Sequence, residues 1–362
     1  MCLITMLHSM PFIKMQPQQR RFIHRSPVLH LKLRLLRRSA NRAHLTIPNV
    51  SFTLETFSYA DCVEKFRFTK TTLRSLANFL RIPARVVTAE RTACSAVEAL
   101  CILLRRFAVP DRWSDLMSMF GRSRSGLYNI FLHVLDHIHN EFANIIFLDR
   151  IGAKLADFSQ AIVDKGGEVE NVWAFIDETV RECCRPGGDE RQRCVFNGHK
   201  RRHAVKYQTL VTPDGIIAHA FGPIEGRRHD LTILRQSNLE SVIGMDGRFG
   251  GFVVYGDPAY GYSDQLASPF GGARLTAAQR EVNKSMSRVR ISVEWSFGQV
   301  VQYWPIVDYK KKMRIGKSPI SKMYKVAVLL TNCITCDRGR NTNSVYFGLP
   351  PPSLEEYLHV NM

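Results

Sequence analysis

Hydrophobic and polar residues alternate with two different periods along this 362-residue chain, and the change of period divides the chain into two regions. Between residues 56 and 150 apolar residues recur every three or four positions, which is the period of an amphipathic helix. In the stretch SAVEALCILLRRFAVP the apolar stripe runs from Val97 to Phe107, and Pro110 ends it. We therefore expect an all-helical region here, without strand-like alternation.

Two further helical patterns in this region are joined by a short turn. The stretch DRWSDLMSMFG ends in Gly121, a natural C-terminal stop. The stretch RSRSGLYNIFLHVLDHIHNEF begins again with Ser123 or Ser125 as its N-cap. Helix, turn and helix are the outline of a helix-turn-helix, in which Arg122, Ser123 and Arg124 lie where a recognition helix would begin. A small helical bundle with a solvated charged turn is the alternative.

From about residue 168 the pattern changes to strands. The stretches NVWAFID, AVKYQTLVT and IIAHAFG predict three strands, and PDG predicts a hairpin turn between the last two. A helix is predicted over DLTILRQSNLE, followed by a nearly all-apolar fourth strand in GGFVVYGD, as expected of a strand covered on both faces. A last helix is predicted over NKSMSRVRISVEWSFGQVVQYW. This order predicts an α/β domain, a mixed sheet flanked by helices.

Three carboxylates lie where such a fold can bring them together. Asp177 ends the first predicted strand, Asp257 ends the fourth, and Glu294 lies one position off the apolar stripe of the last helix. Clustered carboxylates repel one another unless a cation or proton is present. Oxygen ligands at an open site suit Mg²⁺ or Mn²⁺, and two such ions can activate an attacking hydroxyl and stabilise the leaving oxygen at phosphorus. Taken singly, each aspartate can be a turn residue, and Glu294 can be a surface partner of Arg290.

The charge balance points to a polyanionic partner. Lys and Arg number 50 against 32 Asp and Glu, a net charge of +18, and nucleic acid is the commonest partner of such a chain. Residues 1–54 contain basic residues and no acid. We expect a flexible arm there, with a nuclear address; a mitochondrial transit peptide is the alternative. The motif GHKRRHAVK places four cations where DNA phosphates would need positioning, or along a solvated sheet edge: Lys200, Arg201, Arg202 and Lys206.

The cysteines and the apolar runs narrow the class of protein further. Nine scattered cysteines in a chain without a recognisable secretory signal do not predict a disulfide framework. Two groupings resemble zinc ligands without reproducing a paired zinc motif: Cys183, Cys184 and Cys194 with His199 and His203, and Cys333 with Cys336. No apolar run approaches the roughly 18–20 residues that span a bilayer. We expect an intracellular, nuclear protein without a membrane partner.

Four blocks of the sequence resemble the Harbinger-type transposases and the nucleases derived from them. They are AFIDETVRECCRP, FNGHKRRHAVKYQTLVTPDGIIAHAFGPIEGRRHDLTIL, VVYGDPAYG and NKSMSRVRISVEWSFG, and with the helical part the resemblance covers about residues 60–335. It implies a ribonuclease-H-like fold and a DDE triad of Asp177, Asp257 and Glu294, which would bind the metal ions. Such an enzyme is a metal-dependent DNA endonuclease or transposase that cuts transposon ends, with strand transfer as a further step.

The resemblance also implies supporting residues and partners. Asp230 falls on a family acid and, with His229, is assigned a supporting role; it is the main rival for a metal-binding position. The chain departs from the family at Glu178, where a small residue is common, so that this side chain either crowds the metal pocket or points away. A separate Myb-like DNA-binding protein is the implied partner, and a homo-oligomer is left open.

We therefore predict four parts and one leading function. The parts are a basic arm (1–55), a helical, helix-turn-helix-like DNA-binding region (56–155), a ribonuclease-H-like DDE nuclease domain (156–340) and a tail (341–362). The leading function is that of a DNA endonuclease or transposase. The alternatives are a noncatalytic DNA-binding or scaffold protein that keeps the fold, and a ribonuclease-H-type enzyme that acts on RNA.

Overall fold

Residues 45–142 and 151–359 are described by a computed structural model. Nearly all of the expected basic arm lies outside these residues. The chain divides into the units Met1–Ile47 and Pro48–Met362, and the second contains every element discussed below. No helix in the described part of the chain is long and apolar enough to cross a membrane.

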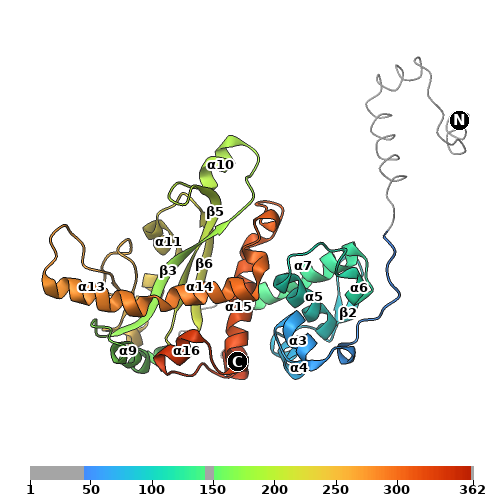
Figure 1. The fold of residues 1–362 in the computed structure, drawn as a ribbon, viewed down its shortest axis with the longest axis horizontal. Helices are drawn as coiled ribbons and strands as arrows, with labels where there is room; N and C mark the ends of the chain where they lie inside the picture. Colours follow the sequence, from blue (N-terminus) through green and yellow to red (C-terminus); the bar gives the residue numbers. More distant parts are fainter. Residues whose placement is uncertain (1–44, 143–150, 360–362) are drawn as a thin grey trace, which may run out of the picture. The chain divides into compact units, whose positions relative to one another are not determined.

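The first part of this unit is mainly helical (Figure 1). Its helices are α3 (Tyr59–Phe66), α4 (Lys70–Phe79), α5 (Ala96–Ala108), α6 (Met117–Phe120) and α7 (Arg124–Glu141). A hairpin of β1 (Arg85–Val87) and β2 (Ala93–Ser95) lies between α4 and α5. The expectation of an all-helical region was wrong at this hairpin, because strands of three residues are too short to show a period of two.

The two helices of the predicted helix-turn-helix differ greatly in length. Ser123 is the N-cap of α7, and its Oγ accepts the backbone N–H of Gly126 at 3.1 Å. The preceding helix α6 has only four residues. Residues before it form a turn instead, in which the Asp115 carboxylate accepts the N–H of Arg112 at 3.0 Å, a local bond that competes with helix formation.

The second part is built on a mixed sheet of six strands. They are β3 (Val172–Glu182), β4 (Phe196–Asn197), β5 (Arg202–Val211), β6 (Ile217–Glu225), β7 (Val253–Tyr255) and β8 (Leu266–Ala267). The order β6-β5-β3-β7-β8 combines antiparallel pairs on one side of β3 with parallel pairs on the other, and β4 pairs with the beginning of β5. The ribonuclease-H-like sheet expected from the sequence is confirmed, with the short β8 and β4 added.

Helices cover both faces of this sheet (Figure 1). The helices of the second part are α9 (Leu155–Asp164), α10 (Asp189–Val195), α11 (Asp230–Ser237), α12 (Leu239–Gly244), α13 (Ala277–Arg290), α14 (Ser292–Tyr303), α15 (Ile320–Arg338), α16 (Thr342–Phe347) and α17 (Leu354–His359). Alternation along β3 separates two cores: Phe175 packs in the core that contains α14 and α15, whereas Ile176 packs with residues of α11 and α12. The first core also includes the mainly helical part, where Phe107 lies edge-on to Trp304 with ring centroids 6.0 Å apart.

Two predicted helices are each split into two. The long helix predicted near the C-terminal end of the domain consists of α13 and α14, which run almost end to end across the sheet (Figure 1). They meet at Ile291, whose carbonyl accepts the N–H of Glu294 at 3.1 Å in a tighter turn. The helix predicted after the third strand consists of α11 and α12, separated by Asn238 in a left-handed conformation with φ 54°.

Candidate carboxylate site

Asp177 lies inside a strand, and the expectation that it ends one was wrong. Strand β3 continues to Glu182, because its second half pairs with the beginning of β5. The parallel pairing of β3 with β7, by contrast, ends at Phe175 opposite Tyr255. Asp177 is therefore paired with Thr209 on one side and has passed the end of β7 on the other.

Asp257 follows β7 two residues after its last strand residue. One carboxylate oxygen accepts the backbone N–H of Ala259 at 2.9 Å, which holds the turn after the strand. Gly256 allows this chain segment to approach its neighbours closely, because a Cβ there would lie 2.7 Å from the Tyr260 ring and 2.9 Å from the Ile176 side chain. The two aspartates thus lie at the edge where β7 ends, Asp177 within β3 and Asp257 just after the neighbouring parallel strand.

Burial and mutual repulsion make the charged forms of both aspartates less favourable. The pKa of Asp177 is raised by burial, and the negative charge of Asp257 raises it further. The pKa of Asp257 is likewise raised by burial, with a further contribution from Asp230. Three carboxylates therefore influence one another here, and a cation would relieve the repulsion.

Arg290 already supplies a positive charge to Asp177. Its Nη1 donates a hydrogen bond of 2.7 Å to Asp177 Oδ2, and the two side chains are 23% and 15% exposed. Arg290 is the last residue of α13, so the break between α13 and α14 places its side chain over β3. The sequence suggested Glu294 as a partner of Arg290, whereas the structure pairs this arginine with Asp177.

Glu294 lies in the first turn of α14, which packs against β3 and β5. It is exposed, and its side chain makes no hydrogen bond or ion pair with any other described residue. In the part of the chain that the structure describes, no group of three or more His, Cys, Asp or Glu side chains could hold a metal ion as placed. The structure therefore brings Asp177 and Asp257 to one edge and leaves Glu294 outside a closed ligand set.

A second charged cluster lies on the opposite face of β3. Glu178 follows Asp177, so its side chain points to the other side of the sheet, away from Arg290. There the Lys206 Nζ lies 2.7 Å from Glu178 Oε2 and 3.1 Å from Asp230 Oδ1. Glu178 therefore points away from the Asp177–Arg290 pair and is held by an internal lysine.

The protonation of this second cluster follows from its burial. Burial, together with the neighbouring Asp230, raises the pKa of Glu178 to about 8. Burial opposes ionisation of Asp230 as well, yet hydrogen bonds from Glu178 and Lys206 hold the pKa of Asp230 below its ordinary value. His229, the N-cap residue of α11, adds a smaller contribution that also lowers the pKa of Asp230. Asp230 is thus the ionised member, and Lys206 is the cation that keeps it so.

The predicted DNA-contact residues fall into two groups. The first group is exposed around the β4–β5 turn and consists of Lys200, Arg201 and Arg202. The Arg202 Nη1 also lies 3.6 Å from Glu182 Oε2. Lys206 is only 6% exposed, and its ammonium group is paired with two carboxylates. The prediction that Lys206 contacts DNA therefore overestimated its accessibility. The alternation of residues along β5 indicates on which face of the sheet Lys206 lies. It does not indicate that the carboxylates of Glu178 and Asp230 lie on the same face.

The predicted recognition-helix residues are placed differently from one another. Arg122 forms a bidentate pair with Glu98 of α5, with its Nη2 donating at 2.9 Å to Glu98 Oε2. Ser123 is used as the N-cap of α7, as described above, and Arg124 is exposed at the start of the helix. Arg124 is therefore the member of this group that is available to a partner.

Comparison with known proteins finds a match to the part of the chain that contains these carboxylates. Residues 176–332 match a family model described as DDE superfamily endonuclease. The match includes Asp177, Asp230, Asp257, Arg290 and Glu294. No curated protein and no solved structure matches the chain.

Proposed function

From the match of residues 176–332 to the DDE superfamily endonucleases, we propose that the protein is a metal-dependent DNA endonuclease of the transposase type. It would hydrolyse phosphodiester bonds at transposon ends, with strand transfer by the freed 3′-OH as a further step. The observation that carries the proposal is the pair of partly buried carboxylates where β7 ends, Asp177 in β3 and Asp257 just after the parallel neighbour β7.

The donor set fits a hard divalent cation, Mg²⁺ or Mn²⁺. Asp177 and Asp257 would hold it with oxygen ligands, and Glu294 would complete the set from α14, with Asp230 as the rival third acid. When bound, one or two such ions would lower the pKa of an attacking water and stabilise the leaving oxygen. The raised pKa values of both aspartates support this assignment, because they show two carboxylates whose charged forms lack full compensation.

The protein's own residues would orient the reacting strand around this pair. Arg290 holds Asp177 in one orientation, and its remaining N–H groups can donate to a phosphate oxygen, since a guanidinium carries five donors. Asp257 is fixed by the turn that Gly256 permits and Ala259 caps. In our proposal Lys206 holds Asp230 to the sheet and does not contact DNA.

DNA binding is proposed for the exposed cations. Lys200, Arg201 and Arg202 would contact phosphates beside the sheet, and Arg124 at the start of α7 would do so in the helical part. The resemblance to Harbinger-type transposases supports a nuclear location and a Myb-like partner, and both remain proposals, as does a homo-oligomer.

The test is nicking of a labelled duplex that carries the element's ends. Wild type, Asp257→Ala and the matched surface control Asp264→Ala would be compared in Mg²⁺, Mn²⁺ and EDTA. Asp264 is exposed in the loop that follows β7, so its loss leaves the site intact. We expect metal-dependent nicking that Asp257→Ala abolishes and Asp264→Ala retains.

A noncatalytic DNA-binding protein that retains the fold is the second candidate. The observation in its favour is that Arg290 already forms an ion pair with Asp177. This candidate predicts DNA binding that is equal in EDTA and Mg²⁺ with no nicking, even when a Myb-like partner is added. Such a result would replace the nuclease proposal.

A further inference from the structure

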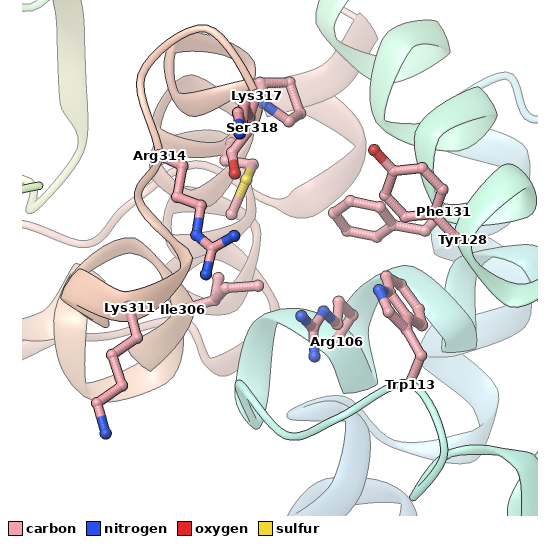
Figure 2. Close-up of a pocket in the computed structure, with 11 residues that line it drawn as sticks. Arg106, Trp113, Tyr128, Phe131, Ile306, Lys311, Arg314, Lys317 and Ser318 are labelled. Carbon is pink, nitrogen blue, oxygen red and sulfur yellow. The ribbon is translucent and has the colours of Figure 1, made fainter. Parts of the chain in front are cut away.

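A cleft lies between the mainly helical part and the segment that leads into α15 (Figure 2). Its volume is about 290 Å³, close to the lower end of the roughly 300–1,000 Å³ typical of small-molecule sites. One wall comes from α5, α7 and the turn between them, and the other from residues 306–323. A cleft of this size accommodates one small planar group with its attached charge.

The charged residues that line the cleft are all cationic: Arg106, Lys311, Arg314 and Lys317. No acidic residue is among the lining residues, and none of the four cations makes an ion pair with a described carboxylate. Figure 2 shows the Arg314 and Arg106 guanidinium groups on opposite sides of the space. The cleft is therefore complementary to an anion.

Arg106 is the most informative of these cations. It is only 4% exposed, and its Nη1 donates to the backbone carbonyl of Asp111. Burial lowers the pKa of Arg106, although the nearby Asp111 charge partly opposes this effect. A buried guanidinium without a carboxylate ion pair is unfavourable, and an anion in the cleft would compensate for it.

Aromatic rings form the rest of the helical wall. The Arg106 guanidinium lies 4.4 Å from the centroid of the Trp113 ring, which in turn packs edge-on against Tyr128 and Phe131 at 5.8 and 5.4 Å. Phe131 is buried, whereas Tyr128 is 38% exposed. Tyr128 therefore offers ring surface to a planar ligand beside the cations.

We propose that this cleft binds one nucleotide unit of a DNA strand, with its base against Tyr128 and its phosphate between Arg106 and Arg314. A base provides the flat apolar group and a phosphate provides the anion, and aromatic stacking combined with a cationic groove is how proteins hold single strands. This inference rests on the DNA binding in the proposed function but not on cleavage, because a protein that binds DNA without cutting it would still use the cleft.

The experiment is anisotropy with a fluorescein-labelled single-stranded oligothymidylate and a matched abasic strand. The full-length protein would be compared with Tyr128→Leu, Tyr128→Phe, Arg314→Gln and the exposed control Arg288→Gln on α13. For wild type we expect binding of the base-containing strand about tenfold tighter than that of the abasic strand, from one stacked base. Tyr128→Leu should lose this preference, and Tyr128→Phe should keep it.

The remaining variant tests the phosphate half of the site. Arg314→Gln should weaken binding of both strands several-fold, while Arg288→Gln leaves both unchanged. Equal binding of the two strands by wild type, or an unchanged preference in folded Tyr128→Leu, would overturn the proposal. An equal loss in Arg288→Gln would also overturn it, because general charge would then explain the binding. Repeating the assay with Asp257→Ala in EDTA separates this site from the nuclease, since we expect binding there to be unchanged.

Discussion

The Arg290 guanidinium donates a 2.7 Å hydrogen bond to Asp177, so the first carboxylate of the site has a cationic partner from α13. Burial raises the pKa of Asp177, and Arg290 is the strongest of the influences that oppose this rise. The arginine therefore favours the ionised form of this partly buried carboxylate, although burial still raises its pKa overall.

A double-mutant cycle should show that this pair is coupled. We expect Arg290→Gln to lower the free energy of unfolding by about 1–3 kcal/mol, because it leaves the carboxylate of Asp177 without its charged donor. In an Asp177→Asn background the same change should have a much smaller effect. Urea unfolding of the four proteins measures the coupling, and Arg288→Gln in the same last turn of α13 is the control. Additive effects would show that the hydrogen bond contributes nothing to stability.

Lys206 should contribute more to the stability of the folded protein than a surface lysine does. Lys206→Met leaves Glu178 and Asp230 facing one another without their shared cation, and breaking a buried pair in this way costs about 3–5 kcal/mol. Adding Asp230→Asn should recover part of the loss, since the buried negative charge that Lys206 compensates is then removed. The control is Lys284→Met, whose exposed ion pair with Glu281 should contribute less than about 1 kcal/mol. Equal thermal stability of the two lysine variants would contradict this role for Lys206.

His219 should make stability depend on pH. Burial lowers the pKa of His219 from 6.5 to about 4, with a smaller effect of Lys325, so the unfolded chain takes up this proton first. The contribution of neutral His219 to the free energy of unfolding is therefore complete above pH 6.5. It is lost as the pH falls toward 4, and the loss amounts to about 3 kcal/mol. Urea unfolding from pH 4 to 7 should show this slope in wild type and in the exposed control His199→Gln, and a flatter profile in His219→Leu. The same slope in His219→Leu would exclude this histidine as its source.

Gly256 should be irreplaceable beside Asp257. Gly256→Ala places a methyl group within 3 Å of Tyr260 and Ile176, and overpacking of this kind costs about 1–3 kcal/mol. The shift should also displace Asp257 and reduce nicking. The control Gly298→Ala, in α14 with no atom within 4 Å of the new methyl group, should instead stabilise the protein by about 0.5–1 kcal/mol. Full nicking activity in Gly256→Ala would show that Asp257 tolerates the displacement.

The sequence predicted the parts of the fold that depend on local periodicity. The stripe from Val97 to Phe107 became α5, Ser123 became the N-cap of α7, and the hairpin of β5 and β6 appeared where PDG predicted its turn. Short elements such as β1 and β8 were missed, because two or three residues carry no measurable period.

The site was only partly predictable for a different reason. Asp177 and Asp257 lie at one edge of the sheet because β3 and β7 are neighbours, and from the sequence this strand adjacency was only a condition of the prediction. The partners of Arg290 and Lys206 depend on which helix covers which face, and a single sequence does not contain that information. Charged residues four positions apart looked like a helix pair, yet the break at Ile291 directed Arg290 to the sheet.

The most direct test of the proposed metal site is Mn²⁺ binding followed by electron paramagnetic resonance, without DNA. Wild type would be compared with Asp177→Asn, Asp257→Asn and Glu294→Gln, and with the exposed controls Asp264→Asn and Glu281→Gln. We expect saturable binding in wild type and both controls, loss of binding in the two aspartate variants, and weaker binding in Glu294→Gln. Equal Mn²⁺ binding by wild type and Asp257→Asn, with both proteins folded, would contradict the assignment of the metal to this carboxylate pair.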